Sequence, residues 1–424
     1  MMARLLYSLI FYVAQPLVWL RLLWRGRKQP EYRRHVGERY GFYPPAPARP
    51  LLWLHAVSVG ETRAAEPLIE ALLAKYPAHA LLLTHMTPTG RETGRMYVER
   101  HPGRVIQAYL PYDLPDAAAR FLAHFRPEIG VFMETELWPN LIAAARRRRI
   151  PLALVNARLS AKSQRGYQRL HALVAPAFAA LDLVAAQTAA DALRLRSVGA
   201  RTTEVTGNLK FDVTPDPIKL AKGNNWRAEI GGRPVWLAAS TRDGEEALVL
   251  DALLRMRLPR VLLILVPRHP QRFDEVAALV ASRRLGLKRR SLDEFPDAGT
   301  MVWLGDSMGE MAAYYAAADL ALIGGSLLPF GGQNLIEAAA CGCPVIVGQH
   351  TFNFAQAADD AVACGAAVRI AGAEDLAATV EAILAHPEQR ANMKEKAIAF
   401  SRSHQGATER TMALLAALTA RAAR

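Results

Sequence analysis

Short apolar runs alternate with longer amphipathic segments along most of the chain from residue 51 onwards. In the first half of the chain, the apolar runs predict β-strands at residues 51–55, 80–84, 105–109, 128–133, 151–155 and 182–186. Helical patterns separate these runs, for example at 62–75, 115–125 and 138–149. Continuous apolar strands joined by helices are typical of a parallel sheet that is covered on both faces. We therefore expect a doubly wound α/β domain in this half.

The alternation is interrupted at about residues 212–234, where three prolines and three glycines occur and apolar periodicity is weak. This composition predicts a linker. The alternation then resumes, and strands are predicted at 235–239, 260–266, 301–304, 319–323, 344–347 and 366–370, before a helical, Ala-rich end at 387–422. The expected fold class is α/β, with two doubly wound domains at 41–212 and 234–424 joined by a linker at 213–233.

The first 40 residues follow a different pattern. Residues 5–24 form a 20-residue apolar stretch that contains one charge, Arg21, and the helix-weakening Pro16, and this length can cross a bilayer once. A helix lying in the membrane interface also fits, whereas a signal peptide lacks its small-residue cleavage site. Residues 25–39 hold six Lys or Arg against two Glu, which marks the cytoplasmic side and attracts anionic lipids. Residues 1–40 are therefore predicted to be a membrane anchor with a basic juxtamembrane segment, and the rest of the chain to be cytoplasmic.

Composition adds constraints on partners and cofactors. The 424 residues include 52 Lys or Arg and 39 Asp or Glu, and the net charge of +13 favours anionic partners such as a membrane, nucleic acid or a phosphorylated substrate. Three cysteines (Cys341, Cys343 and Cys364) are too few for a disulfide framework and indicate a reducing compartment. No Walker-type loop, G-x-G-x-x-G, zinc or Asp-x-Asp motif occurs. The sequence therefore predicts neither a metal ion nor a dinucleotide cofactor.

Three polar motifs mark the first half. Glu61 ends a His-Ala-Val-Ser-Val-Gly-Glu segment after the first strand, where it either complements a helix dipole or acts as a general base. Glu134 and Glu136 follow the fourth strand, and these carboxylates either cap the next helix or face a positive charge on a substrate or a catalytic cation. Lys210 lies beside the linker, where it is either solvated or reaches into the cleft that two facing α/β domains would form.

Three further motifs follow strands of the second half. Arg268, within Pro-Arg-His-Pro, suits a phosphate because a guanidinium can donate two parallel hydrogen bonds. The segment 306–310 opens a helix, and 331–337 leads a glycine-rich loop into a helix whose first N–H groups can bind an anion. Each loop alone is explained by a capped, glycine-rich connection. Three of them at strand ends of one domain favour a nucleotide site.

In their order and composition, these motifs resemble those of the 3-deoxy-D-manno-octulosonic acid (Kdo) transferase family. The similar segments are SVGE (58–61), METELWPN (133–140), NARLS (156–160), TGNLKFD (206–212), LVPRHP (265–270), GDSMGEM (305–311) and GGQNLIEAAA (331–340). The similarity extends over nearly the whole chain and includes the apolar amino terminus. Gln333 and Arg242 stand where the family often has His, so the resemblance assigns no role to either position.

The resemblance implies two Rossmann-like domains in the GT-B arrangement and a metal-independent, inverting glycosyltransferase without cofactors. The implied reaction transfers Kdo from CMP-Kdo to lipid IVA, the tetra-acylated lipid A precursor, at the inner membrane during lipopolysaccharide synthesis. Glu61 would be the proton acceptor, and Glu134 and Lys210 would stabilise the transition state. The residues that match the CMP-binding segments are Pro267, Arg268, Met308, Gly309, Glu310, Asn334, Leu335, Ile336 and Glu337. The expected partners are CMP-Kdo, the lipid acceptor and anionic lipids of the inner membrane.

Two other functions compete with this one. A sugar-nucleotide epimerase shares the fold but needs no membrane anchor, so residues 5–24 argue against it. A membrane-tethered protein that binds nucleotides or nucleic acid without catalysis would explain the charge. Its basic residues should then lie among exposed aromatics on one face, whereas here they gather beside the apolar amino terminus and at helix ends. Nucleic acid is therefore not an expected partner, and the number of Kdo residues added is left open.

Overall fold

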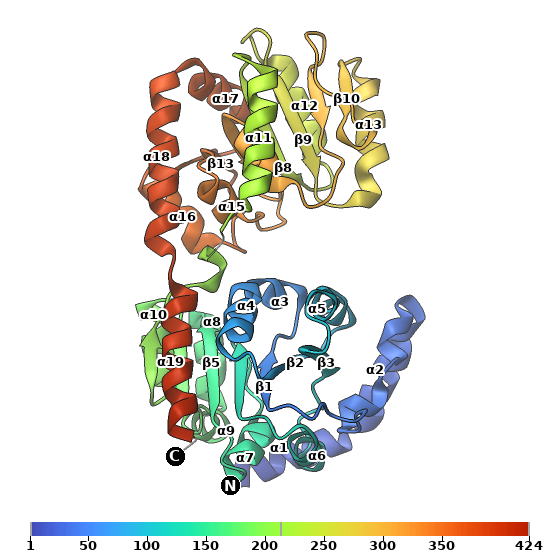
Figure 1. Ribbon diagram of the computed structural model, residues 1–424, viewed down its shortest axis with the longest axis vertical. Coiled ribbons are helices and arrows are strands. Elements are labelled where there is room, and N and C mark those ends of the chain that lie inside the picture. Colours follow the sequence, from blue (N-terminus) through green and yellow to red (C-terminus); the bar gives the residue numbers. More distant parts are fainter. Residues whose placement is uncertain (1, 213, 423–424) are drawn as a thin grey trace. The chain divides into compact units, whose positions relative to one another are not determined.

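The computed structural model describes residues 2–212 and 214–422 (Figure 1). The chain divides into two compact units, one formed by Met1–Asp212 together with Gln405–Arg424 and the other by Val213–His404. Each unit contains one seven-stranded sheet with helices packed around it. The predicted α/β class with two parallel-sheet domains is therefore confirmed.

The first unit is built on a parallel sheet with the strand order β3-β2-β1-β4-β5-β6-β7. Its strands are β1 (Leu51–His55), β2 (Ala80–His85), β3 (Val105–Tyr109), β4 (Ile129–Met133), β5 (Leu152–Ala157), β6 (Leu183–Ala186) and β7 (Thr203–Val205). Its helices are α1 (Met2–Val13), α2 (Gln15–Lys28), α3 (Val59–Ala64), α4 (Glu66–Lys75), α5 (Pro88–Arg100), α6 (Pro115–Phe125), α7 (Pro139–Arg147), α8 (Ala161–Arg169), α9 (His171–Phe178), α10 (Ala189–Ser197) and α19 (Ala407–Ala422), with short 3₁₀ helices η1 (Pro30–Arg33), η2 (Val36–Tyr40) and η3 (Leu209–Phe211). Along β1, Leu51 and Trp53 belong to one hydrophobic core while Leu52 and Leu54 belong to another. Both faces of the strand are thus buried, which explains its continuous apolar sequence.

The second unit has the strand order β10-β11-β9-β8-β12-β13-β14, again with parallel pairing. Its strands are β8 (Val235–Thr241), β9 (Leu262–Pro267), β10 (Leu287–Arg289), β11 (Val302–Leu304), β12 (Leu320–Ile323), β13 (Val345–Val347) and β14 (Ala367–Arg369). Its helices are α11 (Pro217–Ile230), α12 (Glu245–Arg255), α13 (Phe273–Ser282), α14 (Met311–Ala317), α15 (Leu335–Ala340), α16 (Ala355–Ala363), α17 (Leu376–Ala385) and α18 (Pro387–His404), with 3₁₀ helices η4 (Pro270–Arg272), η5 (Arg290–Leu292) and η6 (Ala373–Asp375). The sequence did not predict β7 and β10, which are three-residue strands at the sheet edges.

In each sheet, successive strands are first added on one side of the first strand and then on its other side. In the first unit β1 lies between β2 and β4, and in the second unit β8 lies between β9 and β12. Ligands of open α/β sheets bind outside the carboxyl ends of the strands at such a switch point. These positions therefore locate a candidate site in each unit.

The segment predicted as a linker, 213–233, instead contains helix α11, which packs against α14 within the second unit. The Asp216 side chain caps the helix by accepting a hydrogen bond from the Ile218 N–H at 2.9 Å, and Pro217 occupies its first turn. The Trp226 ring lies 5.0 Å from the ring of Trp303, centroid to centroid. Pro217 thus begins a packed helix, Gly223 lies inside it and Gly231 follows its last residue.

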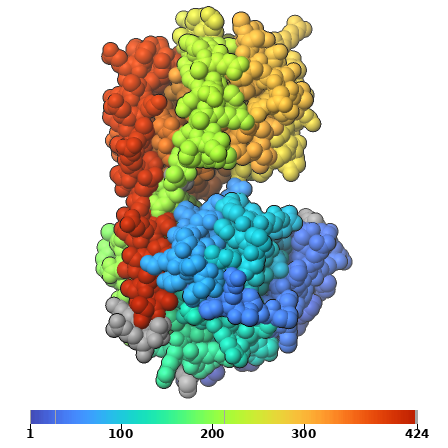
Figure 2. Space-filling model, viewed as in Figure 1, coloured from blue at the N-terminus to red at the C-terminus, as the bar shows by residue number. Residues whose placement is uncertain are grey.

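The carboxyl-terminal boundary also differs from the predicted domain 234–424. The Ala-rich segment is broken at Gly406, whose φ of +89° suits glycine, and α19 then packs against α4 and β6 of the first unit (Figure 2). The Asp212 carboxylate accepts hydrogen bonds from the Gly406 N–H at 2.6 Å and from the Thr408 N–H. The first unit is therefore completed by the end of the chain.

The amino terminus is not the single helix expected at residues 5–24. It forms α1 and α2, which are bent by 49° at their junction, and Pro16 lies in the first turn of α2, where its missing N–H costs no hydrogen bond. Among the described residues no single helix is both long and apolar enough to cross a membrane, although the bent pair reaches the required length and apolar content together. On α1, the Ser8 hydroxyl lies 3.1 Å from Asn140 Oδ1 and the Tyr12 hydroxyl 2.5 Å from Asp116 Oδ1.

Gly223 gives a direct test of the packing of α11. A Cβ atom at this position would lie 2.2 Å from the carbonyl oxygen of Ala313. Gly223→Ala is expected to lower the free energy of unfolding by about 2–3 kcal/mol in urea denaturation, although alanine favours a helix. Gly232→Ala is the control, because no atom lies within 4 Å of its added Cβ. Equal stability of the two variants would contradict the packing of α11 described here.

Candidate active site

The first candidate site lies at the carboxyl ends of β1 and β4 and contains Glu61. This residue is in the first turn of α3, and its half-buried carboxylate accepts hydrogen bonds from the Val57 N–H at 2.8 Å and the Ser58 hydroxyl at 2.9 Å. Ser58 in turn caps the helix by accepting from the Glu61 N–H at 3.4 Å. Burial raises the pKa of Glu61, and the nearby Glu134 raises it further against the lowering effects of the two donors and Lys210. The carboxylate is thus fixed in direction and more basic than a solvated glutamate.

Glu134 and Lys210, separated by 76 residues in sequence, form an ion pair beside this carboxylate. Lys210 Nζ lies 3.3 Å from Glu134 Oε1, and both side chains are largely buried. Glu134 has a left-handed φ of +58° directly after β4. Lys210 lies on η3, which is anchored by a hydrogen bond of 3.0 Å from the Leu209 N–H to Asn156 Oδ1. Asn156 is itself left-handed (φ +52°), and such uncommon backbone geometry clusters at functional sites.

Glu136 is a third carboxylate of this cluster, to which the sequence motifs assigned no role of its own. Burial, followed by the negative charges of Glu61 and Glu134, raises the pKa of Glu136 to about 7. Three carboxylates therefore lie close together. Glu61 and Glu134 feel the charge of Lys210, and Glu136 holds a proton for part of the time at neutral pH. The feature of the sequence that indicated Glu136 as a member of this cluster was the Glu-x-Glu spacing at the end of a strand.

Two buried histidines end β1 and β2, close to the segment that leads into α3, and the sequence analysis selected neither as a site residue. His85 Nδ1 is 2.9 Å from the carbonyl oxygen of Ala56, and His55 Nδ1 is 2.9 Å from the Thr84 hydroxyl oxygen. Burial lowers the pKa of His55 to about 3 and that of His85 to about 4, so both rings are neutral at pH 7. A neutral His85 can donate to Ala56 and hold the start of the loop.

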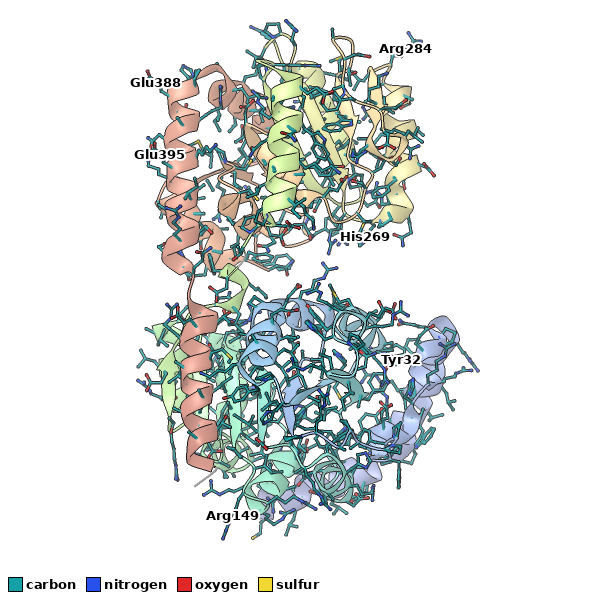
Figure 3. All side chains as sticks on the ribbon, in the orientation of Figure 1. Tyr32, Arg149, His269, Arg284, Glu388 and Glu395 are labelled. Carbon is teal, nitrogen blue, oxygen red and sulfur yellow. The ribbon has the colours of Figure 1, made fainter. Side chains whose placement is uncertain are left out.

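The second candidate site lies at the carboxyl ends of β8 and β9 and is basic. The Arg268 N–H donates to the carbonyl oxygen of Thr241 at 2.9 Å, which fixes the chain directly after Pro267. The neighbouring His269 is exposed (Figure 3), and its pKa is lowered by partial burial and then by Arg242, Arg268 and Arg272. Arg272 forms an ion pair with Glu246, in which Nη1 lies 2.7 Å from Oε1. The electropositive field here suits an anionic group.

Glu310 is tied into a network that includes the helix mistaken for a linker. Its carboxylate pairs with Lys222 of α11 and with Arg290, whose Nε lies 3.2 Å away, and it accepts from the Ser307 hydroxyl at 2.5 Å. Burial opposes ionisation, but these partners lower the pKa of Glu310 below its usual value. Met308 is 65% exposed and Gly309 is left-handed (φ +77°), so the backbone before Glu310 is accessible to a ligand.

The glycine-rich loop leads into α15 as the sequence indicated. Asn334 Oδ1 accepts from the Ile336 N–H, and Asn334 Nδ2 donates to Glu337 Oε1, both at 3.0 Å. Leu335 and Ile336 are 1% and 0% exposed, so both residues are packed inside the unit.

The loop after β12 depends on the buried Glu245, which the motifs did not single out. Its carboxylate accepts from the N–H groups of Gly325 at 2.6 Å and Leu327 at 3.0 Å. Burial raises the pKa of Glu245, and these donors partly offset that effect. Among the described residues no group of His, Cys, Asp and Glu is placed to hold a metal ion.

The fold of two parallel-sheet units is shared with glycosyltransferases and with sugar-nucleotide epimerases. Residues 247–400 match the family model described as "Glycosyl transferases group 1". A glycosyltransferase from Rickettsia africae is similar in structure, with a TM-score of 0.59 and 13% identity over 88% of this chain and 99% of that one. UDP-GlcNAc 2-epimerase from Neisseria meningitidis has a TM-score of 0.56 and 16% identity over 86% and 99%. At such identities the likeness shows the fold alone, which glycosyltransferases share with these epimerases.

Sequence relatives define the family within this class. Residues 34–213 match the family model described as 3-deoxy-D-manno-octulosonic-acid transferase (kdotransferase). The chain is 47% identical over 423 residues to 3-deoxy-D-manno-octulosonic acid transferase from Bordetella pertussis, covering 97% of this chain and 98% of that protein. It is 37% identical over 425 residues to the Haemophilus influenzae transferase, covering 98% of each. The chain therefore belongs to the Kdo transferase family of glycosyltransferases, as its motifs predicted.

Proposed function

We propose that the protein transfers Kdo from CMP-Kdo to a hydroxyl of lipid IVA, the tetra-acylated lipid A precursor, with inversion at the anomeric carbon and release of CMP. The observation that carries this proposal is the cluster in the first unit, where the oriented Glu61 carboxylate lies beside the Lys210–Glu134 ion pair in a chain of the Kdo transferase family. An inverting displacement needs only one base, because a single hydroxyl proton is removed as the acceptor attacks.

Glu61 is the proposed base. The Val57 N–H and the Ser58 hydroxyl each occupy one lone pair of its carboxylate, which leaves further acceptor capacity for the proton of the attacking alcohol. An efficient general base has a pKa near the operating pH, and the raised pKa of Glu61 brings this residue closer to that condition. The geometry that caps α3 thus also orients the base, so capping and catalysis are compatible.

Lys210 and Glu134 stabilise the charges of the transition state. Cleavage of the bond between the anomeric carbon and the CMP phosphate leaves positive charge on the sugar and negative charge on the phosphate. Lys210 offsets negative charge on the leaving phosphate or on the carboxylate of Kdo. Glu134 orients Lys210 or faces the cationic sugar. No divalent metal takes part, and CMP is released from the donor as an anion.

The second unit binds the CMP part of the donor in this proposal. Support comes from the basic field around Arg268 and from the accessible backbone of Met308 and Gly309. Asn334 and Glu337 offer side-chain polar groups, whereas the buried Pro267, Leu335 and Ile336 shape the segments that carry the site. Glu310 positions this loop through Lys222 and Arg290 and accepts nucleotide hydroxyls through its remaining lone pairs.

Membrane contact at the cytoplasmic face of the inner membrane is part of the same proposal. On α1 and α2 large apolar side chains are exposed, among them Leu5, Leu9, Val13, Leu17 and Trp24. Their exposure and the basic residues at 25–39 support docking on anionic lipids, where the acyl chains of the acceptor lie. The apolar helices then place the enzyme on the surface that holds its acceptor.

Arg268→Ala tests the nucleotide half of the proposal. Loss of its guanidinium is expected to weaken CMP binding about tenfold or more in calorimetry and to raise the KM for CMP-Kdo by a similar factor. Arg255→Ala, at the end of α12 on the same unit, is the control and is expected to bind CMP normally. CMP affinity of Arg268→Ala equal to that of the control would refute a phosphate contact by Arg268.

A further inference from the structure

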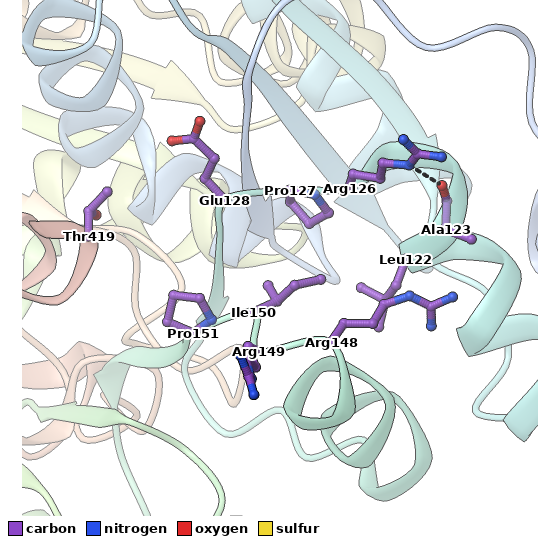
Figure 4. A pocket seen from close by; sticks show the side chains of 10 residues that line it. All are labelled: Leu122, Ala123, Arg126, Pro127, Glu128, Arg148, Arg149, Ile150, Pro151 and Thr419. Carbon is purple, nitrogen blue, oxygen red and sulfur yellow. Dashed lines mark hydrogen bonds between the residues drawn. The ribbon is translucent and has the colours of Figure 1, made fainter. Parts of the chain in front are cut away.

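A cavity of about 720 Å³ lies on the first unit, away from the residues discussed so far (Figure 4). Pro127 and Glu128 line it directly before β4, and Ile150 and Pro151 line it directly before β5. All strands of this sheet are parallel. The cavity therefore lies at the amino-terminal ends of the strands, opposite the carboxyl ends that carry Glu61 and Glu134. It is therefore a separate feature of the unit.

The cavity is lined by arginines from the ends of two helices. Arg126 is the residue after α6, and Arg148 and Arg149 follow α7. All three are exposed, and among the described residues no carboxylate lies within ion-pair distance of any of them. Glu128, the acidic residue of the lining, is directed to His79, with Oε2 3.0 Å from Nε2. The cavity consequently has a net positive charge.

The arginines surround an apolar floor. Leu122, Pro127 and Pro151 are buried, and Figure 4 shows Arg126 and Arg148 on the same side of the cavity with Leu122 between them. The Arg126 Nε–H donates to the carbonyl oxygen of Ala123 at 3.2 Å, which holds the guanidinium beside the end of α6. This combination of an apolar floor and guanidinium donors fits an anion attached to an apolar or carbon-rich body.

We propose that this cavity binds a phosphate-bearing anion through Arg126 and Arg148, with Arg149 adding to the field. Guanidinium groups bind phosphate oxygens with paired, charge-assisted hydrogen bonds, and an anion would offset the three like charges gathered here. The observations favour the head group of a membrane phospholipid as its source. Helix α1 packs against α7, the helix that ends in Arg147, and it exposes apolar side chains such as Leu5 and Leu9. Binding at this edge goes beyond the proposed transfer reaction and does not depend on it.

The test compares two double variants of the full-length protein. Arg126→Glu/Arg148→Glu reverses charge at the cavity, and Arg255→Glu/Arg284→Glu makes the same change at two exposed arginines beside the ends of α12 and α13 in the second unit. Binding is measured with phosphatidylcholine vesicles with and without phosphatidylglycerol. The cavity variant is expected to lose about tenfold or more of its affinity for the anionic vesicles, and the control about threefold or less. Equal losses in both variants, or no loss in either, would overturn the proposal.

A second arm distinguishes the source of the phosphate. Glycerol phosphate is titrated into the proteins without vesicles. If the cavity variant loses this binding but binds anionic vesicles like the control, the site holds a soluble phosphate rather than a lipid head group. Thermal melting checks that both variants are folded, and Arg148→Gln replaces the double variant if that protein is unstable. Kdo transfer in detergent solution is expected to be equal in the two double variants, so the result separates this site from the catalytic assignments.

Discussion

Glu61→Gln is expected to lower the rate of Kdo transfer by about 10²–10⁴-fold, the range that a general base contributes. Glutamine keeps the shape of the side chain and an oxygen that accepts from the Val57 N–H, so the capping of α3 and the thermal stability should change little. The loss should appear in kcat, with CMP binding unchanged, because the second unit is untouched. The measurement is a transfer assay with CMP-Kdo and lipid acceptor, combined with calorimetric titration of CMP.

The pH profile separates the base from a structural carboxylate. A base whose pKa is raised above that of free glutamate is inactive when protonated, so wild-type activity falls as the pH drops through the pKa of Glu61. The residual activity of Glu61→Gln should lack this acid limb. Glu66→Gln is the control, since Glu66 is also an acidic residue in the first turn of a helix but pairs with Arg100 at 2.9 Å. A Glu61→Gln variant as active as Glu66→Gln would rule out Glu61 as the base.

Lys210→Met is expected to lower kcat by about 10²–10³-fold, the magnitude associated with loss of one charge-stabilising donor. The substitution removes the cation 3.3 Å from Glu134 Oε1 and leaves Glu134 and Glu61 without its positive charge. Since Lys210 lowers the pKa of Glu61, its loss should also move the acid limb of the activity profile to higher pH. Both effects are measured by transfer kinetics over a range of pH.

Lys219→Met provides a matched control for that substitution. Lys219 is also a lysine near a carboxylate, 3.9 Å from Asp216, but it lies on α11 at the surface of the second unit. Its variant is expected to keep wild-type kcat and pH dependence. A Lys210→Met enzyme within twofold of this control would show that the ion pair serves folding alone.

Much of the fold could be predicted because its strands are buried on both faces. Along β1, residues facing either core are apolar, so the sequence reads as a continuous run that periodicity detects. Strands β7 and β10 were missed because three residues at a sheet edge carry too little pattern. Helix α11 was missed because Pro217, Gly223 and the glycines after Ile230 resemble a linker. The packing of Gly223 against Ala313 and of Trp226 against Trp303 appears only in the folded unit.

The sequence indicated which residues belong to the candidate site, but it did not indicate how these residues are arranged in space. Glu61 and Glu134 follow adjacent parallel strands, and this neighbourhood depends on the strand order, which the sequence does not state. The pair between Glu134 and Lys210 joins residues 76 positions apart. The elevated pKa of Glu136 arises from burial together with two neighbouring charges. Helix α1 likewise contacts residues far away in the sequence, through Ser8 with Asn140 and Tyr12 with Asp116.

The central claim is that the protein moves Kdo from a cytidylyl donor to a lipid hydroxyl, and mass spectrometry of the lipid product tests it most directly. Purified protein is incubated with CMP-Kdo and lipid IVA in buffer containing EDTA. We expect a lipid whose mass has increased by one or more Kdo residues, the release of one CMP for each residue added, and inverted configuration at the new glycosidic bond by NMR. An unmodified lipid, or transfer that stops when EDTA is added, would contradict the central claim.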